Sequence, residues 1–330
     1  MNKYFLKKVL FSLLIFGSLF LGPKSWATKY AGEFLSLGVG ARALAMGGAY
    51  TALASDATGA YWNPAGIAQM ERPQITFMHS ATFGDLVKYD YLGLVKPGGK
   101  ATLGFCLLRL GIDEIPDTRG ALLDEDNDGE MDQGEKLDEE KIKMIRDEEL
   151  ALFTSYALKK KKNLFWGVSA KLLGKFIGEN QSLGIGFDVG CLYSPFPFLS
   201  LGMNFQDPTG TILVWDTGRK EIITPTCRTG FALKRKTNSP PGMFNLSFDT
   251  ETRFEGRKTA AQFAISSLSI DTHLGVEYWL KNTVALRLGL DKGNLTVGAG
   301  LKYKRFQVDY AFLNNEDLGD CNRLSGSFHF

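Results

Sequence analysis

The stretch from residue 273 to residue 313, HLGVEYWLKNTVALRLGLDKGNLTVGAGLKYKRFQVDYAFL, repeats one pattern. Apolar residues alternate with small or polar ones, as in Val284, Leu286, Leu288 and Leu290 against Ala285, Arg287, Gly289 and Asp291. Successive side chains of a strand leave opposite faces, so an alternation of period two predicts strands. The segments reach ~9–11 residues, the length that crosses a bilayer at a tilt. The polar face mixes glycine with full charges, which is typical of a crowded barrel lumen. A soluble β-sandwich is the alternative.

The same pattern extends back along the chain and predicts about fourteen strands. An even number is expected of a single-chain bacterial barrel. The connections after even-numbered strands are short, whereas the long ones, 111–147, 206–224, 251–270 and 314–321, follow odd-numbered strands. Short periplasmic turns and long outer loops are the usual asymmetry of such barrels. We therefore expect an all-β fold, a transmembrane antiparallel barrel over residues 74–330. The strands should lie near 74–83, 86–96, 100–110, 148–158, 163–175, 183–193, 198–205, 225–235, 242–250, 271–281, 283–291, 294–303, 305–313 and 322–330.

The first residues resemble an export signal. Lys3, Lys7 and Lys8 precede an apolar run at 9–22, and Ala27 closes a small-residue cleavage site. We expect residues 1–27 to be a signal peptide and the mature chain to reside in the bacterial outer membrane, in contact with its lipid. The net charge of +2 predicts no nucleic-acid partner.

Residues 28–73 lie between the signal and the first strand and show neither helical nor strand periodicity. Glycine and alanine dominate this segment, and Asn63-Pro64 marks a turn. Small side chains allow tight coiling in a narrow space, so we expect a plug in the barrel lumen. The plug is either fixed, with Arg42, Asp56 and Asn63 hydrogen-bonding the inner wall, or a gate that rearranges.

The plug sequence GARALAMGGAYTALASDATGAYWNPAG resembles the N-terminal hatch of FadL-type outer-membrane channels for hydrophobic compounds. It is closer still to their PorV/PorQ-like and UPF0164 relatives. Weaker similarity continues through DPTGTILVWDTG, LGVEYWLKNTVALRLGL and LTVGAGLKY to the C-terminal aromatic strand. The resemblance implies a fourteen-stranded barrel plugged by its N-terminus. The hatch residues that we single out are Arg42, Asp56, Asn63, Pro64 and Gly66.

The outer loop 111–147 contains DEDNDGEMDQGE, which matches the calcium loop of an EF-hand. The oxygen ligands would come from Asp124, Asp126, Asp128, Glu130 through its carbonyl, Asp132 and Glu135. The alternative is a solvated acidic loop. Pro116 and Gly120 disfavour an entering helix, while 137–146 could form an exiting one. We expect Ca²⁺ as a structural cofactor that orders this loop, because a sensor would need paired helical hands.

Enzyme chemistry has little support, because none of His79, His273 and His329 lies in a hydrolase or metalloprotease motif. Inward charges such as Asp188, Asp249, Glu277, Arg287 and Asp309 are expected to pair with one another or with the plug. Two functions stay open. The first is passive uptake of a hydrophobic small molecule, such as a long-chain fatty acid, through a hatch-gated lumen. The alternative is a barrel without transport that docks exported proteins or anchors a surface complex through its outer loops.

Overall fold

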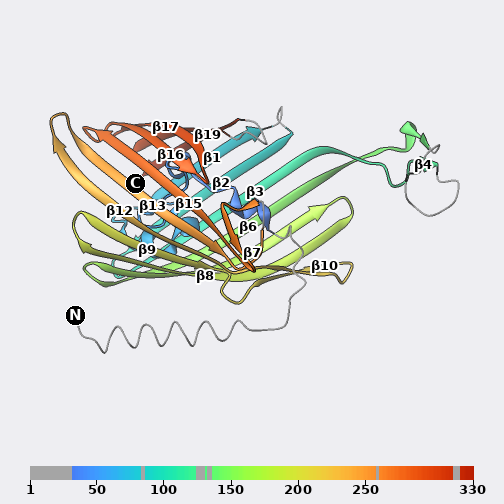
Figure 1. The fold of residues 1–330 in the computed structure, drawn as a ribbon, viewed down its shortest axis with the longest axis horizontal. Coiled ribbons are helices and arrows are strands. Elements are labelled where there is room, and N and C mark those ends of the chain that lie inside the picture. Colours follow the sequence, from blue (N-terminus) through green and yellow to red (C-terminus); the bar gives the residue numbers. More distant parts are fainter. Residues whose placement is uncertain (1–31, 83–85, 124–130, 132–135, 258–259, 315–319) are drawn as a thin grey trace.

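The computed structural model describes residues 32–82, 86–123, 131, 136–257, 260–314 and 320–330. Their strands form an antiparallel barrel that closes where β1 pairs with both β2 and β19 (Figure 1). Fourteen strands of the described chain make the ring, which confirms the predicted fold class. In ring order they are β1 (Gln74–Thr82), β2 (Val87–Gly98), β3 (Ala101–Asp117), β6 (Lys143–Lys161), β7 (Leu164–Ile177), β8 (Asn180–Phe196), β9 (Leu199–Gln206), β12 (Thr226–Asn238), β13 (Pro241–Arg253), β15 (Leu268–Leu280), β16 (Val284–Asp291), β17 (Asn294–Tyr303), β18 (Phe306–Leu313) and β19 (Cys321–His329).

The alternation of the sequence becomes the two faces of the barrel wall. In β3, Leu103, Phe105 and Leu107 point outward with 43%, 43% and 40% of their surface exposed. Inward-facing positions of the wall strands are buried. In β16, for example, Arg287 is 3% exposed. An apolar outer face with a polar interior is the arrangement of a barrel in lipid.

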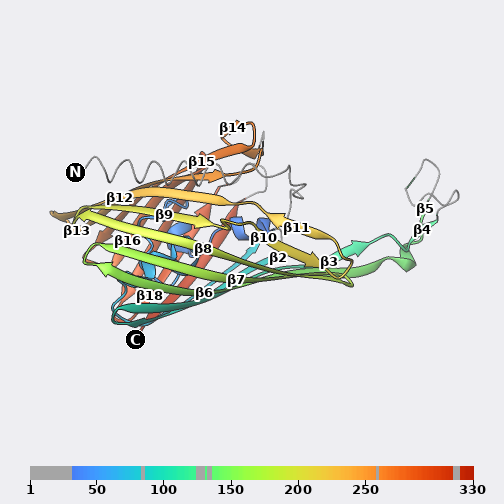
Figure 2. The same ribbon diagram turned by 90° about the horizontal axis from the view of Figure 1, so that it is seen from below.

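The two ends of the barrel differ. The C-terminus and the short turns share one end, which is the periplasmic end in this architecture. At the other end β3 and β6 run past their neighbours as a two-stranded ribbon, seen on the right of Figures 1 and 2. At its tip β4 (Leu122–Leu123) pairs with β5 (Lys136–Leu137), followed by the 3-10 helix η3 (Glu139–Lys141). We call residues 113–146 the outer arm.

One wall strand is interrupted. Four residues of β8, from Ile185 to Asp188, face seven residues of the next chain segment, from Gln206 to Ile212. The excess residues form a bulge at 207–210, after which β10 (Thr211–Trp215) and β11 (Lys220–Ile223) continue the β9–β12 hairpin outward. A further short strand, β14 (Phe263–Ile265), pairs with the start of β15.

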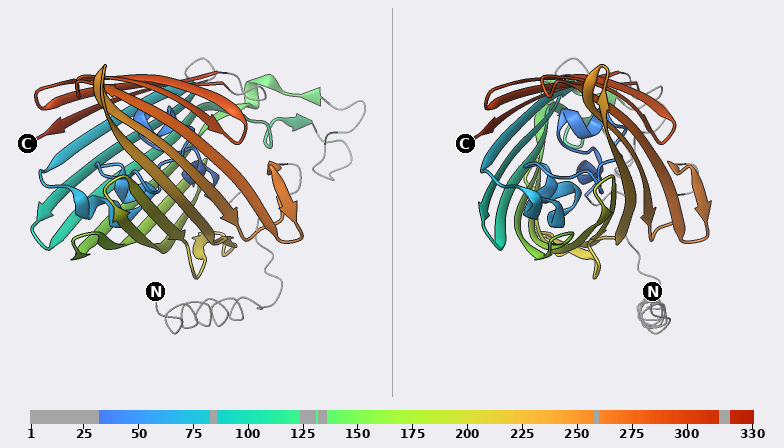
Figure 3. Two further views of the ribbon diagram at one scale, coloured as in Figure 1. Left: turned by 60° about the vertical axis from the view of Figure 1, so that its left-hand side comes forward. Right: turned by 90° about the vertical axis from the view of Figure 1, so that its left-hand side faces the viewer.

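The first part of the described chain, coloured blue, lies inside the barrel, as the end-on view on the right of Figure 3 shows. We call its residues 32–70 the hatch. None of the helices in the described part of the chain is long and apolar enough to span a membrane. The hatch contains η1 (Glu33–Ser36), α2 (Ala41–Leu44), α3 (Gly59–Trp62) and η2 (Pro64–Gln69).

Candidate functional site

Glycines in the barrel wall make room for the hatch. At Gly190 a side-chain Cβ would lie 2.9 Å from Pro64 Cδ and would also collide with Asn63. At Gly289 it would collide with the backbone of Met46 and Gly47. Close approach of two backbones is a common reason for glycine within a strand. Other inward glycines that touch the hatch are Gly104, Gly167, Gly202, Gly275 and Gly298.

A buried charge cluster holds α2 to the wall. The Arg42 guanidinium donates to both carboxylate oxygens of Glu277, at 2.8 and 2.7 Å. Arg287 donates to Glu277 at 2.7 Å and lies 2.8 Å from Asp309, and Asn245 donates to Glu277 at 2.9 Å. Glu277 therefore joins the hatch to three wall strands, and the lumen charges pair as expected from the sequence.

A second wall carboxylate binds hatch backbone. One oxygen of Asp249 accepts hydrogen bonds from the amides of Tyr50 and Thr51, at 2.9 and 2.7 Å. Nearby, Nδ1 of the buried His273 lies 2.9 Å from the carbonyl oxygen of Gly47 and 3.0 Å from Asp291. His273 thus faces the polar lumen, where it contacts the hatch.

Asn63 is buried at the predicted turn and makes contacts on both of its amide atoms. Its Nδ2 donates to the carbonyls of Thr51 and of Cys191 in β8, at 2.9 and 3.1 Å, and its Oδ1 accepts from the Ala65 amide. Pro64 begins η2, where a missing amide hydrogen is tolerated. At Gly66 a Cβ would collide with the carbonyl of Ala54, so this glycine permits the hatch to fold on itself.

The hydrogen bonds of Asp56 differ from the prediction that its carboxylate bonds to the inner wall. Its carboxylate accepts hydrogen bonds from the Tyr50 hydroxyl at 2.5 Å and from the Thr58 amide at 3.0 Å, and it lies 3.6 Å from Arg42. All three partners belong to the hatch, so the predicted hydrogen bond from Asp56 to the inner wall is wrong. The reason is that the chain turns back at 54–58 and satisfies the carboxylate locally.

Sequence reasoning missed one cluster at the bulge. Lys171 in β7 is 2% exposed and lies 2.7 Å from Asp188 and 2.5 Å from Asp207. Asp207 adopts a left-handed backbone, and its amide donates to the Asp188 carboxylate. The lysine thereby ties β7 and β8 to the bulge that follows β9, where the wall is interrupted.

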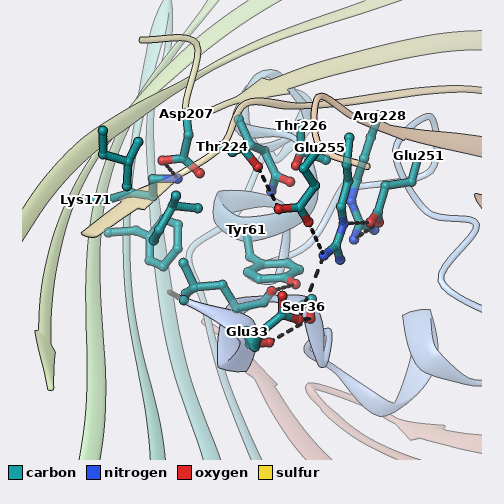
Figure 4. Close-up of a pocket in the computed structure, with 17 residues that line it drawn as sticks. Glu33, Ser36, Tyr61, Lys171, Asp207, Thr224, Thr226, Arg228, Glu251 and Glu255 are labelled. Atoms are coloured by element: carbon teal, nitrogen blue, oxygen red, sulfur yellow. Dashed lines mark hydrogen bonds and ion pairs between the residues drawn. The ribbon is translucent and has the colours of Figure 1, made fainter. Parts of the chain in front are cut away.

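Cavities lie at both ends of the hatch. The outer one has a volume of about 60 Å³ and includes Lys171, Asp207 and the pair Arg228–Glu251 in its lining (Figure 4). Two periplasmic ones, of about 460 and 210 Å³, share Arg42, Ser55, Trp279 and Asn282 in their linings. The hatch separates the outer cavity from the periplasmic pair.

The six expected calcium ligands, at 124, 126, 128, 130, 132 and 135, lie outside the described residues. On either side of them, Leu122 pairs with Leu137, and the Asp138 amide donates to the Ala121 carbonyl at 2.7 Å. The hydrogen bond from Lys141 holds the pKa of the Asp138 carboxyl below its ordinary value. The exiting helix considered for 137–146 is wrong, because pairing with β3 makes residues 143–146 part of a strand.

These features define an outer-membrane β-barrel whose lumen is plugged by the hatch, residues 32–70. Residues 22–119 match the model of the uncharacterised protein family UPF0164, which confirms the resemblance that the hatch sequence carries. A search of curated proteins finds no match.

Solved structures share the fold over nearly the whole chain. The Ralstonia pickettii toluene transporter TbuX has a TM-score of 0.59 at 14% identity, covering 89% of this chain and 98% of its own. The Pseudomonas putida toluene transporter TodX gives 0.55 at 12%, covering 88% and 96%. A Pseudomonas aeruginosa FadL homologue gives 0.53 at 11%, covering 85% and 95%. The fold is thus that of the FadL-type outer-membrane channels.

Proposed function

We propose that the protein is an outer-membrane channel for the passive uptake of hydrophobic compounds, along a lumen that its hatch gates. The observation that carries the proposal is the hatch-filled barrel, which has the fold of proteins that transport toluene. The proposal gives the protein no catalytic step. The more specific form of the proposal is that the substrate is a long-chain fatty acid or a similar compound.

The extracellular end offers apolar surface at which such a compound could first bind. Phe263 and Ile265 in β14 are 61% and 75% exposed. Apolar side chains that face water at a loop favour contact with apolar ligands. Beyond that point the hatch separates the outer cavity from the periplasmic ones, so passage requires the hatch to rearrange.

Liposome uptake tests this function. Proteoliposomes would be offered labelled toluene and labelled oleate, with protein-free liposomes as the baseline. We expect protein-dependent uptake of at least one compound, and faster uptake by Glu277→Gln, which weakens the attachment of α2. Glu149→Gln is the matched control, because Glu149 pairs with Lys175 within the wall and forms no hydrogen bond or ion pair with the described hatch residues. Uptake of neither compound above the baseline would refute the proposal, whereas uptake of toluene alone would refute only the fatty-acid form.

A second function is favoured by the outer arm. A ribbon that projects beyond the barrel is unnecessary for a channel and suits docking of an exported protein or a surface complex. Replacing residues 118–142 by a short turn would leave the pore strands intact. If the arm docks a partner protein, this variant no longer co-purifies with that partner but keeps any uptake activity of the wild type. Co-purification of the partner at the wild-type level would exclude the arm as the docking site.

We also propose that Ca²⁺ binds within 124–135 and orders the arm tip. The acidic spacing supports this, and so does the β4–β5 pairing, which brings the two ends of the segment together. Extracellular calcium sites commonly have a Kd of ~10⁻⁴–10⁻³ M. Calorimetric titration of the purified barrel with Ca²⁺ is the test, and Asp124→Asn should abolish the binding heat.

A further inference from the structure

The periplasmic end of the barrel is strongly cationic. We define the periplasmic rim as residues 71–73, 96–100, 159–163, 194–198, 234–241, 281–283 and 302–305. Its sequence has fourteen lysines and arginines but only one acidic residue, Glu71, although the whole chain has a net charge of only +2. Charge of one sign is therefore concentrated at this end. Twelve of the cations are exposed: Arg72, Lys96, Lys100, Lys159, Lys160, Lys161, Lys162, Arg235, Lys236, Lys281, Lys304 and Arg305.

These twelve cations have no acidic partner in the described part of the protein. The ion pairs of the structure include none of them. Toward the extracellular end, by contrast, Arg109 pairs with Glu148 at 2.6 Å and Lys88 with Asp113 at 3.0 Å. The rim thus has free positive charge for an external anion.

The rim borders an exposed aromatic band and shares Tyr303 with it. Tyr303, Phe306 and Phe330 are 66%, 60% and 53% exposed, and the Lys304 ammonium lies 5.3 Å from the centre of the Tyr303 ring. Aromatic side chains concentrate at the membrane–water interface of barrels. Cations directly beyond that band therefore lie at the depth of lipid phosphates.

At the periplasmic end, the rows of outward-facing side chains on the wall strands end in these cations. Lys96 follows Leu94 on the lipid-facing side of β2, and Lys160 follows Leu158 on that of β6. Such lysines keep their carbon chains against apolar surface while the ammonium reaches the headgroups. Five of the six turns that join strands at this end carry exposed cations, the exception being 194–198. A nearly complete ring fits lipid around the barrel better than a protein bound to one sector.

We propose that the periplasmic rim binds the headgroups of anionic phospholipids in the inner leaflet of the outer membrane. The ligand class is a phosphate diester with a net negative charge and two acyl chains. The ammonium and guanidinium groups donate to the phosphate oxygens, while the aromatic band contacts the upper acyl chains. Basic groups near an anionic membrane surface are attracted to it individually, so the effect accumulates around the ring.

Native mass spectrometry of the detergent-purified barrel tests this proposal. The barrel would be equilibrated with equal amounts of phosphatidylglycerol and phosphatidylcholine, and the ratio of retained lipids measured. The test variant is Lys160→Gln/Lys161→Gln/Lys162→Gln. The control is Lys136→Gln/Lys143→Gln/Lys220→Gln, which removes three exposed lysines at the extracellular end that form no ion pair within 4 Å among the described residues. A difference in gel migration between heated and unheated samples would confirm that each variant is a folded barrel.

We expect the wild type to retain phosphatidylglycerol preferentially, the test variant to lose roughly threefold or more of that preference, and the control to keep it. A parallel sample with inorganic phosphate at the lipid concentration separates a lipid site from a simple anion site. Retained preference in phosphate supports the lipid site, whereas full displacement by phosphate overturns it. Equal retention of both lipids by the wild type, or an equal loss in test and control variants, also overturns it.

Discussion

Glu277→Gln is expected to loosen the hatch without unfolding the barrel. Glu277 is fully buried and accepts two hydrogen bonds from Arg42, one from Arg287 and one from Asn245. Glutamine keeps the shape but removes the charge, and its amide nitrogen faces an arginine donor. Breaking a buried ion pair from one side costs ~3–5 kcal/mol. Because Arg42 keeps a weaker contact with Asp56, the lower figure of ~3 kcal/mol applies to the hatch.

Hydrogen exchange measures this loss directly. The Leu44 and Ala45 amides donate to the carbonyls of Gly40 and Ala41, so they exchange only when α2 opens. A loss of ~3 kcal/mol would speed their exchange by roughly two orders of magnitude, since each 1.4 kcal/mol is tenfold. Glu149→Gln provides the control, because it removes an inward charge that forms no hydrogen bond or ion pair with the described hatch residues. Unchanged protection of α2 in Glu277→Gln would refute the reasoning and would assign the hatch's stability to packing alone.

Three further outcomes follow from other contacts. Gly190→Ala should destabilise the hatch by ~1–3 kcal/mol through overpacking, seen as faster exchange of η2, whereas Gly326→Ala, with open space around it, should not. Lys171→Met leaves two facing carboxylates and should lower the thermal midpoint more than Lys175→Met, because the Lys175 side chain is 24% exposed; equal shifts would contradict the role of Lys171 at the bulge. Millimolar Ca²⁺ should protect the arm from trypsin if 124–135 binds it, and protection equal in Mg²⁺ would argue against a calcium site.

Local patterning predicts the wall well because burial in a barrel has period two. β17 spans Asn294–Tyr303, as expected, and β16 differs by one residue. The strands of the outer arm are longer than the sequence pattern predicts, because the alternation of apolar and polar residues is broken there. A register shift between Ile112 and Ile115, with Glu114 in a left-handed conformation, moves side chains to the other face. The pattern therefore predicts that the strand ends at 110, seven residues before Asp117.

Contacts between the hatch and the wall were only partly predictable. Small residues indicate a plug, but which wall glycine faces which hatch residue depends on the barrel's register and shear. Lys171 and Asp207 are brought together by a bulge that no local motif marks. Asp56 differs from the prediction because Tyr50 and Thr58, which are close to it in sequence, donate hydrogen bonds to its carboxylate. Long-range pairing is thus the part that sequence reasoning could not supply.

Both halves of the hatch pack against wall glycines, but among the described residues only the first half forms ion pairs with the wall. Its first half, through α2, depends on the Arg42–Glu277 pair and on hydrogen bonds to Asp249. Its second half, α3 and η2, packs against wall glycines, and buried side chains such as Asn204 donate to its carbonyls. The periplasmic cavities border the first half, because Arg42 lines both of them. Opening toward the periplasm should therefore begin at α2.

This asymmetry predicts how the exchange caused by Glu277→Gln is distributed. Amides of 41–46 should speed up by roughly two orders of magnitude, while those of 59–67 keep the protection of the wild type, because their packing is untouched. The measurement is peptide-resolved exchange over both halves in the same sample. Uniform acceleration would mean that the hatch moves as one rigid plug. In that case a gate at α2 would be excluded, and passage would require the whole segment to leave the lumen.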